Sequence, residues 1–334
     1  MDAQKYIISQ LDALKVPFAV DINPKSDAEM IDAILKFLFS KKFRKFSIPE
    51  KNQAIIRAAV AKNVVNNEPI EIVFPFGGYK LWRLEETPEA DWAELFSIIY
   101  FVRWLKPVCA LYLKGVNFTF WLDEVIVSKM NNVPESDVAA YGKSFDALLA
   151  FVNPWIPLNM KFEVFLERSR YESYDAFEAE LATEVEKLRQ VRIADPKPLS
   201  DEARRSIEMN VKLAEGQASD PMWREKVDLL HCAYYNLQEN NKRVRMPYTN
   251  ENIVAFTISL DSEGILNTIP IGSAKTSIVR FWVGVGALQK REDSFIEAIL
   301  SPSQIEKANC TWEPITVEGL EGKNFNRIRV LSLI

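Results

Sequence analysis

A strand pattern that runs into a glycine-containing loop lies at Ile70–Leu84, which reads IEIVFPFGGYKLWRL. Its first five residues, Ile70–Phe74, are β-formers apart from one glutamate, as in a strand buried in a sheet. A proline, a phenylalanine, two adjacent glycines, Tyr79 and Lys80 follow. Glycines allow the backbone to turn and to approach a ligand closely. The stretch therefore predicts a core strand that ends in a loop able to carry a functional side chain.

Helix and strand patterns alternate after this stretch. A helical pattern, TPEADWAELFSIIYFVRWL, is followed by the strand pattern GVNFTFWLDEVIV, and then by the helical VPESDVAAYGKSFDALLAFV. The strand MKFEVFLE and the helix SYDAFEAELATEVEKLRQVR complete the series. Such alternation predicts the α/β class, with Ile70–Phe74, Phe118–Trp121 and Phe162–Phe165 in one mainly parallel, Rossmann-like sheet.

The segments before and after this core have different secondary-structure patterns. We divide the chain into an N-terminal helical segment (1–69), an α/β core (70–190), a helical or lid segment (191–240) and a β-rich part that completes the domain (241–334). The charged stretch 190–225 fits either a surface helix flanked by loops or a helical hairpin. Within the last part, only SFIEAIL (294–300) and PSQIEKA (302–308) have helical patterns.

Three helix starts carry recognisable signals. Ser26 or Asp27 is suited to cap the helix DAEMIDAILKFLFSKK, and Ser47–Glu50 resembles a capping box. Thr87 followed by Pro88 predicts a helix that begins there, because proline is favoured at the first helical position. Acidic residues in the first turn, Asp91 and Glu94, are explained by the helix dipole or by a function.

Composition and charge narrow the functional classes. The chain has 334 residues, 48% hydrophobic and 26% charged, which suits a large globular core. Its net charge of −5 offers no basic field for nucleic acid. The longest apolar stretch, LFSIIYFVRWL, is short and contains Arg103, so we expect no membrane span. The N-terminal helix has mixed charges, unlike a signal peptide, and we expect a soluble cytoplasmic protein.

Cysteine and histidine are scarce. The three cysteines are widely spaced with no CxxC pair, so we expect neither a disulfide framework nor a zinc site. A single histidine, His231, argues against a catalytic triad or a two-histidine metal site. It lies in the helical stripe VDLLHCAYYNL, where a structural role is favoured over a catalytic one. We expect no metal and no cofactor.

The residues best placed for chemistry follow the predicted strands, because parallel sheets bind ligands at their carboxyl ends. Lys80 comes after Gly77-Gly78 and suits a phosphate or carboxylate, although the P-loop spacing is absent. A solvated lysine in a turn is the alternative. Asp123 and Glu124 end a strand pattern, where neighbouring side chains point to opposite faces. One of them could meet a substrate amine or a metal, or both could belong to a solvated turn.

Cations in the C-terminal part suit an anionic ligand. Arg245 precedes a β pattern, while Lys275 and Arg280 lie near the hydroxyl residues Ser273 and Thr276. Arginine holds phosphate bidentately, so these residues predict a site for a phosphorylated substrate. A charged β surface without a ligand is the alternative.

The order of these segments resembles the isocyanide (isonitrile) synthases, which are grouped with the pyoverdine/dityrosine biosynthesis proteins. The family's Phe-Pro-x-Lys loop, acidic helix start and Ser-Asp-Gly strand end are similar to IEIVFPFGGYK, PEADWAELF and FTFWLDE here. Its V-x-D-x-D-V-x-x-Y-G helix is similar to VPESDVAAYGKSF, with Asp137, Val138, Tyr141 and Gly142 in place. Arg245 corresponds to a later family arginine, and the resemblance covers roughly residues 65–290.

The resemblance implies a transferase of secondary metabolism that condenses the amine of a Tyr- or Trp-like amino acid with ribulose 5-phosphate. It implies no metal, nucleotide or other cofactor, and leaves a homodimer open. The implied site comprises catalytic Lys80 and Asp123 and substrate-binding Tyr79, Arg245, Lys275, Arg280 and Trp282.

Two alternatives remain. The family's two later histidines have no counterpart here, the loop has two extra glycines, and Ser-Asp-Gly is replaced by Leu122-Asp123-Glu124. A related condensing enzyme with a different product, or a non-catalytic binding protein on the same fold, fits these departures. A pocket that gathers Lys80, Asp123, Arg245 and Lys275 would favour an enzyme over a binding protein.

Overall fold

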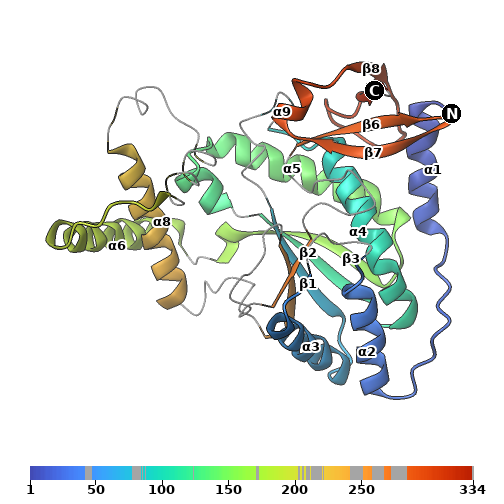
Figure 1. Cartoon of the computed structure of the whole chain (residues 1–334), viewed down its shortest axis with the longest axis horizontal. Helices are drawn as coiled ribbons and strands as arrows, with labels where there is room; N and C mark the ends of the chain where they lie inside the picture. The colour runs from blue at the N-terminus through green and yellow to red at the C-terminus, as the bar shows by residue number, and fades with distance from the viewer. Residues whose placement is uncertain are drawn as a thin grey trace.

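The computed structural model describes residues 1–41, 47–76, 84, 86, 88–122, 124–170, 173–201, 204, 207, 211, 220, 222–240, 251–257, 267–271 and 284–332. The described helices are α1 (Ala3–Lys15), α2 (Asp27–Leu38), α3 (Glu50–Val65), α4 (Trp92–Leu111), α5 (Glu135–Val152), α6 (Tyr174–Ala194), α8 (Trp223–Asn240) and α9 (Pro302–Ile305), with the short turns η1 (Ile126–Met130), η2 (Asn153–Trp155) and η3 (Glu167–Arg170). The described strands are β1 (Ile70–Phe76), β2 (Val116–Leu122), β3 (Met160–Leu166), β4 (Ile253–Thr257), β5 (Thr268–Pro270), β6 (Val285–Arg291), β7 (Ser294–Leu300), β8 (Cys310–Pro314) and β9 (Arg327–Leu331). Figure 1 shows their arrangement.

A five-stranded parallel sheet forms the centre of the fold. Its strand order is β3-β2-β1-β4-β5, and every neighbouring pair is parallel. Ile72, Phe118 and Phe162 lie side by side across β1, β2 and β3. The prediction of one mainly parallel, Rossmann-like α/β sheet is therefore confirmed.

One face of this sheet carries an aromatic core. Phe118 and Phe120 of β2 contact Phe101 of α4, and Phe120 also meets Phe145 of α5 with ring centroids 5.0 Å apart. Helix α4 contacts β2, and it also contacts α1, α2 and the strands β6 and β7. It is buried on nearly every side, as expected for a helix that is hydrophobic all round.

A second, four-stranded sheet lies in the C-terminal part, with strand order β7-β6-β9-β8. Residues 294–300, which the sequence pattern predicts as a helix, form β7 instead. They pair antiparallel with β6 across a tight turn in which Glu292 has a positive φ of 39°. A seven-residue apolar run does not distinguish helix from strand, and here the pairing partner decides. The helical prediction at residues 302–308 is confirmed only for Pro302–Ile305.

The helix starts follow the predicted signals only in part. Ser26 caps α2 as predicted, with its side chain accepting from the Glu29 N–H. Helix α3 has no side-chain cap, so the capping box at Ser47–Glu50 is wrong. Helix α4 begins at Trp92 with Asp91 as its N-cap, not at Thr87 and Pro88.

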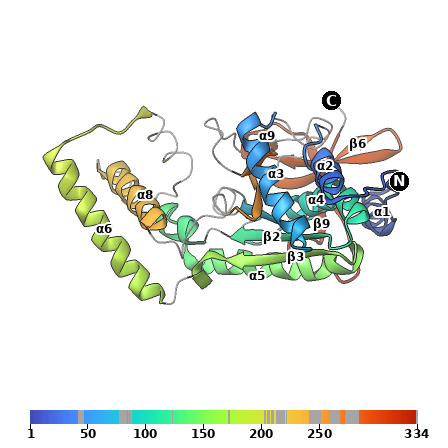
Figure 2. The ribbon, with the colours of Figure 1, turned by 90° about the horizontal axis from the view of Figure 1, so that it is seen from below.

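Helices α6 and α8 pack against each other and project away from the rest of the fold (Figures 1 and 2). The predicted helix over SYDAFEAELATEVEKLRQVR corresponds to α6. Phe177, Leu181 and Tyr234 form a small core with Val125 and Met130, which follow β2. The helical pair is therefore joined to the carboxyl end of the sheet. In the described part of the chain, no helix has the length and hydropathy that a membrane crossing requires.

Candidate functional site

The carboxyl ends of the parallel strands β1, β2 and β3 lie level with one another. Phe76 at the end of β1 pairs in register with Leu122 at the end of β2, which in turn pairs with Leu166 at the end of β3. Residues that follow these strands therefore leave the sheet at one edge, where α/β proteins bind their ligands.

Glu124 lies at this edge, two residues beyond β2. Its side chain is only 7% exposed. Its Oε1 accepts from the backbone N–H of Arg168 at 3.2 Å and pairs with the Arg168 Nε, also at 3.2 Å. Burial raises the pKa of Glu124, and the Arg168 charge opposes that rise. The arginine thus favours the ionised form of a carboxyl group whose burial disfavours it.

Arg168 joins Glu124 to a longer row of charges. Its Nη2 lies 3.4 Å from the Oε1 of Glu135, which opens α5, and Lys129 reaches the same oxygen at 3.3 Å. Lys129 also pairs with Glu178 of α6. Burial by itself raises the pKa of Glu135, but Lys129 and Arg168 outweigh that effect and leave it lowered. The row links the ends of β2 and β3 to α5 and α6.

A cavity of about 540 Å³ opens beside these charges, between α5 and the ends of β2 and β3. We call it the α5–β3 groove. It is lined by Leu122, Glu124, Ser128, Glu135, Val138, Ala139, Gly142, Lys143, Asp146, Val164, Leu166 and Arg168. The groove combines apolar walls with a few charged groups, as small-molecule sites commonly do.

Asp91 and Glu94, the acidic residues at the start of α4, have structural partners. Asp91 accepts from the Ala93 N–H at 2.7 Å, and its own N–H donates to the Glu94 Oε2 at 2.8 Å. Tyr141 donates to the Glu94 Oε1 at 3.0 Å, and Glu94 is fully buried. A reciprocal capping box therefore explains the two acidic residues. The hydrogen bond from Tyr141 to Glu94 links α4 to α5.

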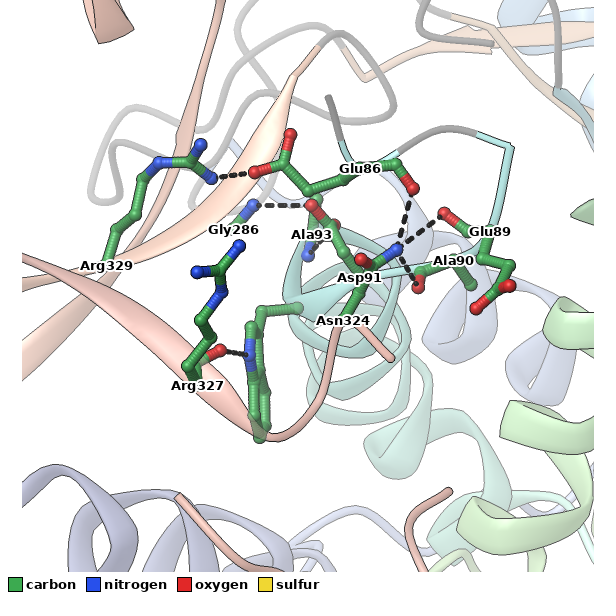
Figure 3. A network of polar contacts seen from close by, with 10 residues as sticks. Glu86, Glu89, Ala90, Asp91, Ala93, Gly286, Asn324, Arg327 and Arg329 are labelled. Atoms are coloured by element: carbon green, nitrogen blue, oxygen red, sulfur yellow. Dashed lines mark hydrogen bonds and ion pairs between the residues drawn. The ribbon is translucent and has the colours of Figure 1, made fainter. Parts of the chain in front are cut away.

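The same helix start is bound to the second sheet (Figure 3). The Gly286 N–H donates to the Asp91 Oδ2 at 3.3 Å, and the Trp92 indole N–H donates to the Arg327 carbonyl at 2.7 Å. Glu86 forms a buried ion pair with Arg329. These contacts hold the beginning of α4 between the two sheets, so they position the site without belonging to it.

All seven residues that the sequence analysis selected for the site lie outside the described residues: Tyr79, Lys80, Asp123, Arg245, Lys275, Arg280 and Trp282. Arg168, by contrast, was not selected. Its only sequence signal was a cluster of charges directly after a strand pattern, in MKFEVFLERSR. Its role depends on β2 and β3 being neighbours.

His231, the single histidine of the chain, is not part of the groove. Burial lowers the pKa of His231, while Asp228 opposes that shift, and the residue lies in α8 away from the α5–β3 groove. Among the described residues, no group of three or more His, Cys, Asp or Glu side chains is arranged to hold a metal ion.

The fold is similar to that of the PvcA protein from Pseudomonas aeruginosa, known from a crystal structure. The match has a TM-score of 0.59 and 14% sequence identity, and it covers 92% of this chain and 99% of the other. No protein-family model matches the chain. The search of curated proteins also found no match. At this identity the likeness establishes the fold alone.

Proposed function

We propose that this protein is an isonitrile-synthase-like enzyme of secondary metabolism. It transfers one carbon from a phosphosugar such as ribulose 5-phosphate to the α-amine of a Tyr- or Trp-like amino acid. Lys80 and Asp123 carry the catalysis. Tyr79, Arg245, Lys275, Arg280 and Trp282 bind the substrates.

The proposal rests on the sequence resemblance to the isonitrile synthases. It is supported by a fold that is shared over nearly the whole of both chains with the PvcA protein. Two motif residues of that resemblance have defined places in the structure. Tyr141 binds the buried Glu94, and Gly142 lets α5 approach Leu122, because a Cβ there would lie 3.2 Å from the Leu122 Cδ2.

The ends of β1 and β2 also support the assignment of the catalytic pair. Asp123 directly follows Leu122, and Lys80 follows Phe76 by four residues, a span of at most about 14 Å. Because Phe76 and Leu122 are register partners, both segments leave the sheet at neighbouring positions. An amine at this edge condenses with the ketose carbonyl, with loss of water, or else attracts the sugar phosphate.

The reaction is tested with uniformly ¹³C-labelled ribulose 5-phosphate and either tyrosine or tryptophan. We expect a product that retains the amino-acid nitrogen and gains one labelled carbon as an isonitrile, detected by mass spectrometry. A labelled product of another kind would favour a related condensing enzyme. Binding of both substrates without any product would favour the non-catalytic alternative.

The predicted anion site gives a separate expectation. Phosphate, sulfate and ribulose 5-phosphate should raise the melting temperature, because a ligand that binds only the folded state stabilises it. Replacing Lys275 and Arg280 together by alanine should abolish the shift. Lys290→Ala with Arg291→Ala, which removes two exposed cations at the end of β6, is the matched control and should leave it intact. An unchanged shift in the first double variant would remove Lys275 and Arg280 from the site.

A further inference from the structure

None of the residues that line the α5–β3 groove has a role in the proposed reaction. Four side chains form its apolar walls: Leu122, Val138, Val164 and Leu166. Its volume of about 540 Å³ lies within the usual range for small-molecule sites. Leu166 ends the edge strand β3 and is 44% exposed, so part of this apolar wall is open to a ligand. These walls suit a ligand with an apolar body.

One oxygen of Glu124 is available to such a ligand. The hydrogen bond and the ion pair between its carboxylate and Arg168 both use Oε1. Within the described ranges, Oε2 takes part in no hydrogen bond or ion pair, although Glu124 lines the groove and is almost fully buried. A carboxylate can only accept hydrogen bonds, so the complementary ligand group must be a donor.

The charges inside the groove favour a cationic donor. Arg168 is shared between Glu124 and Glu135. Lys129 also pairs with Glu135 but is itself shared with Glu178, so this row has three carboxylates and two cations. Lys143 and Asp146 lie on the exposed side of α5 and add one charge of each sign. The inner part of the groove therefore has a net negative charge, which burial makes more effective than the same charge in water.

We propose that the α5–β3 groove binds a small organic ammonium ion with an apolar body. The ammonium donates to the Oε2 of Glu124, and the body packs against Leu122, Val138 and the ends of β3. Arg168 positions the carboxylate and does not contact the ligand. Binding requires no phosphosugar and no turnover, so the inference stands whether or not the proposed reaction occurs.

Calorimetry with 2-phenylethylamine tests the ligand class. Its matched analogues are 2-phenylethanol, which is neutral, and 3-phenylpropionate, which is an anion. We expect the amine to bind at least about tenfold more tightly than either analogue, the usual worth of a charge-assisted hydrogen bond. Equal binding of the amine and the alcohol, or preferred binding of the anion, would overturn the proposal.

Variants test the location of the site. Glu124→Gln keeps the side-chain shape but removes the charge, so the preference for the amine over the alcohol should disappear. Ala139→Leu fills the groove from the exposed side of α5 without removing any polar contact, and should weaken amine binding at least about tenfold. Ala147→Leu, at an exposed position of α5 outside the lining, is the control and should bind like the unmodified protein.

The two groove variants do not depend on each other. If Glu124→Gln fails to fold because it weakens the Arg168 ion pair, Ala139→Leu still decides the location. Unchanged amine binding by Ala139→Leu, at an unchanged melting temperature, would show that the ligand binds elsewhere.

Discussion

Replacing Lys80 by methionine should reduce product formation by roughly a thousandfold or more, because loss of a nucleophile leaves only binding and electrostatic contributions. Lys114→Met is the matched control. It removes an exposed lysine that precedes β2 at the opposite, amino end of the sheet, and it should leave turnover unchanged. The measurement is the rate of labelled isonitrile formation by the purified variants.

A second substitution distinguishes a purely electrostatic role of Lys80 from a covalent one. If Lys80 supplies only charge, Lys80→Arg should retain substantial activity. If its amine becomes covalently bound to the ketose, arginine should fail as completely as methionine, and borohydride should trap the adduct for mass spectrometry. Full turnover by Lys80→Met would remove Lys80 from the reaction under either mechanism.

Replacing Gly286 by alanine should lower the free energy of unfolding by roughly 3 kcal/mol or more, which is at the upper end for overpacking. A Cβ at this position would lie less than 3.0 Å from the Trp92 Cβ, the Trp92 carbonyl carbon and the Ala93 N. Two of these atoms belong to the backbone of α4, which cannot yield by a rotamer change. The shift would also disturb the hydrogen bond from the Gly286 N–H to Asp91. Urea denaturation followed by circular dichroism measures the loss.

Gly142→Ala is the matched control for that prediction. Its Cβ would meet only the end of the Leu122 side chain, at 3.2 Å, and alanine is favoured over glycine by about 1 kcal/mol within a helix. We expect a change in the free energy of unfolding of less than about 1 kcal/mol. An equal loss of unfolding free energy in both variants would contradict the prediction that β6 approaches α4 more tightly at Gly286 than α5 approaches Leu122 at Gly142.

The α/β class of the fold could be predicted from local sequence patterns. Strand patterns at Ile70–Phe74, Phe118–Trp121 and Phe162–Phe165 alternate with long helical patterns, and each pattern is encoded locally by the spacing of apolar side chains. A parallel sheet with helical crossovers buries the apolar side chains of all these strands and helices. The observed sheet therefore agrees with the predicted one.

Where a sequence signal for a helix or strand is short or ambiguous, contacts with distant residues determine the structure. Residues 294–300 carry an apolar run compatible with either helix or strand, and pairing with β6 makes them a strand. Thr87 and Pro88 are good helix-start residues, yet α4 begins at Trp92. At this start the side chain of the N-cap residue Asp91 also accepts a hydrogen bond from the Gly286 N–H of the second sheet. A helix that began at Pro88 would not have Asp91 as its cap. In both cases contacts with distant residues outweigh a local preference of at most about 1–2 kcal/mol.

Which charged residues share a site depends on how the strands pack, and it could not be predicted from the sequence. Glu124 and Arg168 are 44 positions apart in the sequence, and they meet because β2 and β3 are neighbours that end level with each other. Burial then raises the pKa of the Glu124 carboxyl and makes Arg168 its necessary partner. The spacing of apolar side chains along the sequence has the period of a helix or of a strand, and so it predicts these elements. Strand order, register and loss of solvent arise only when those elements pack, and they create the α5–β3 groove.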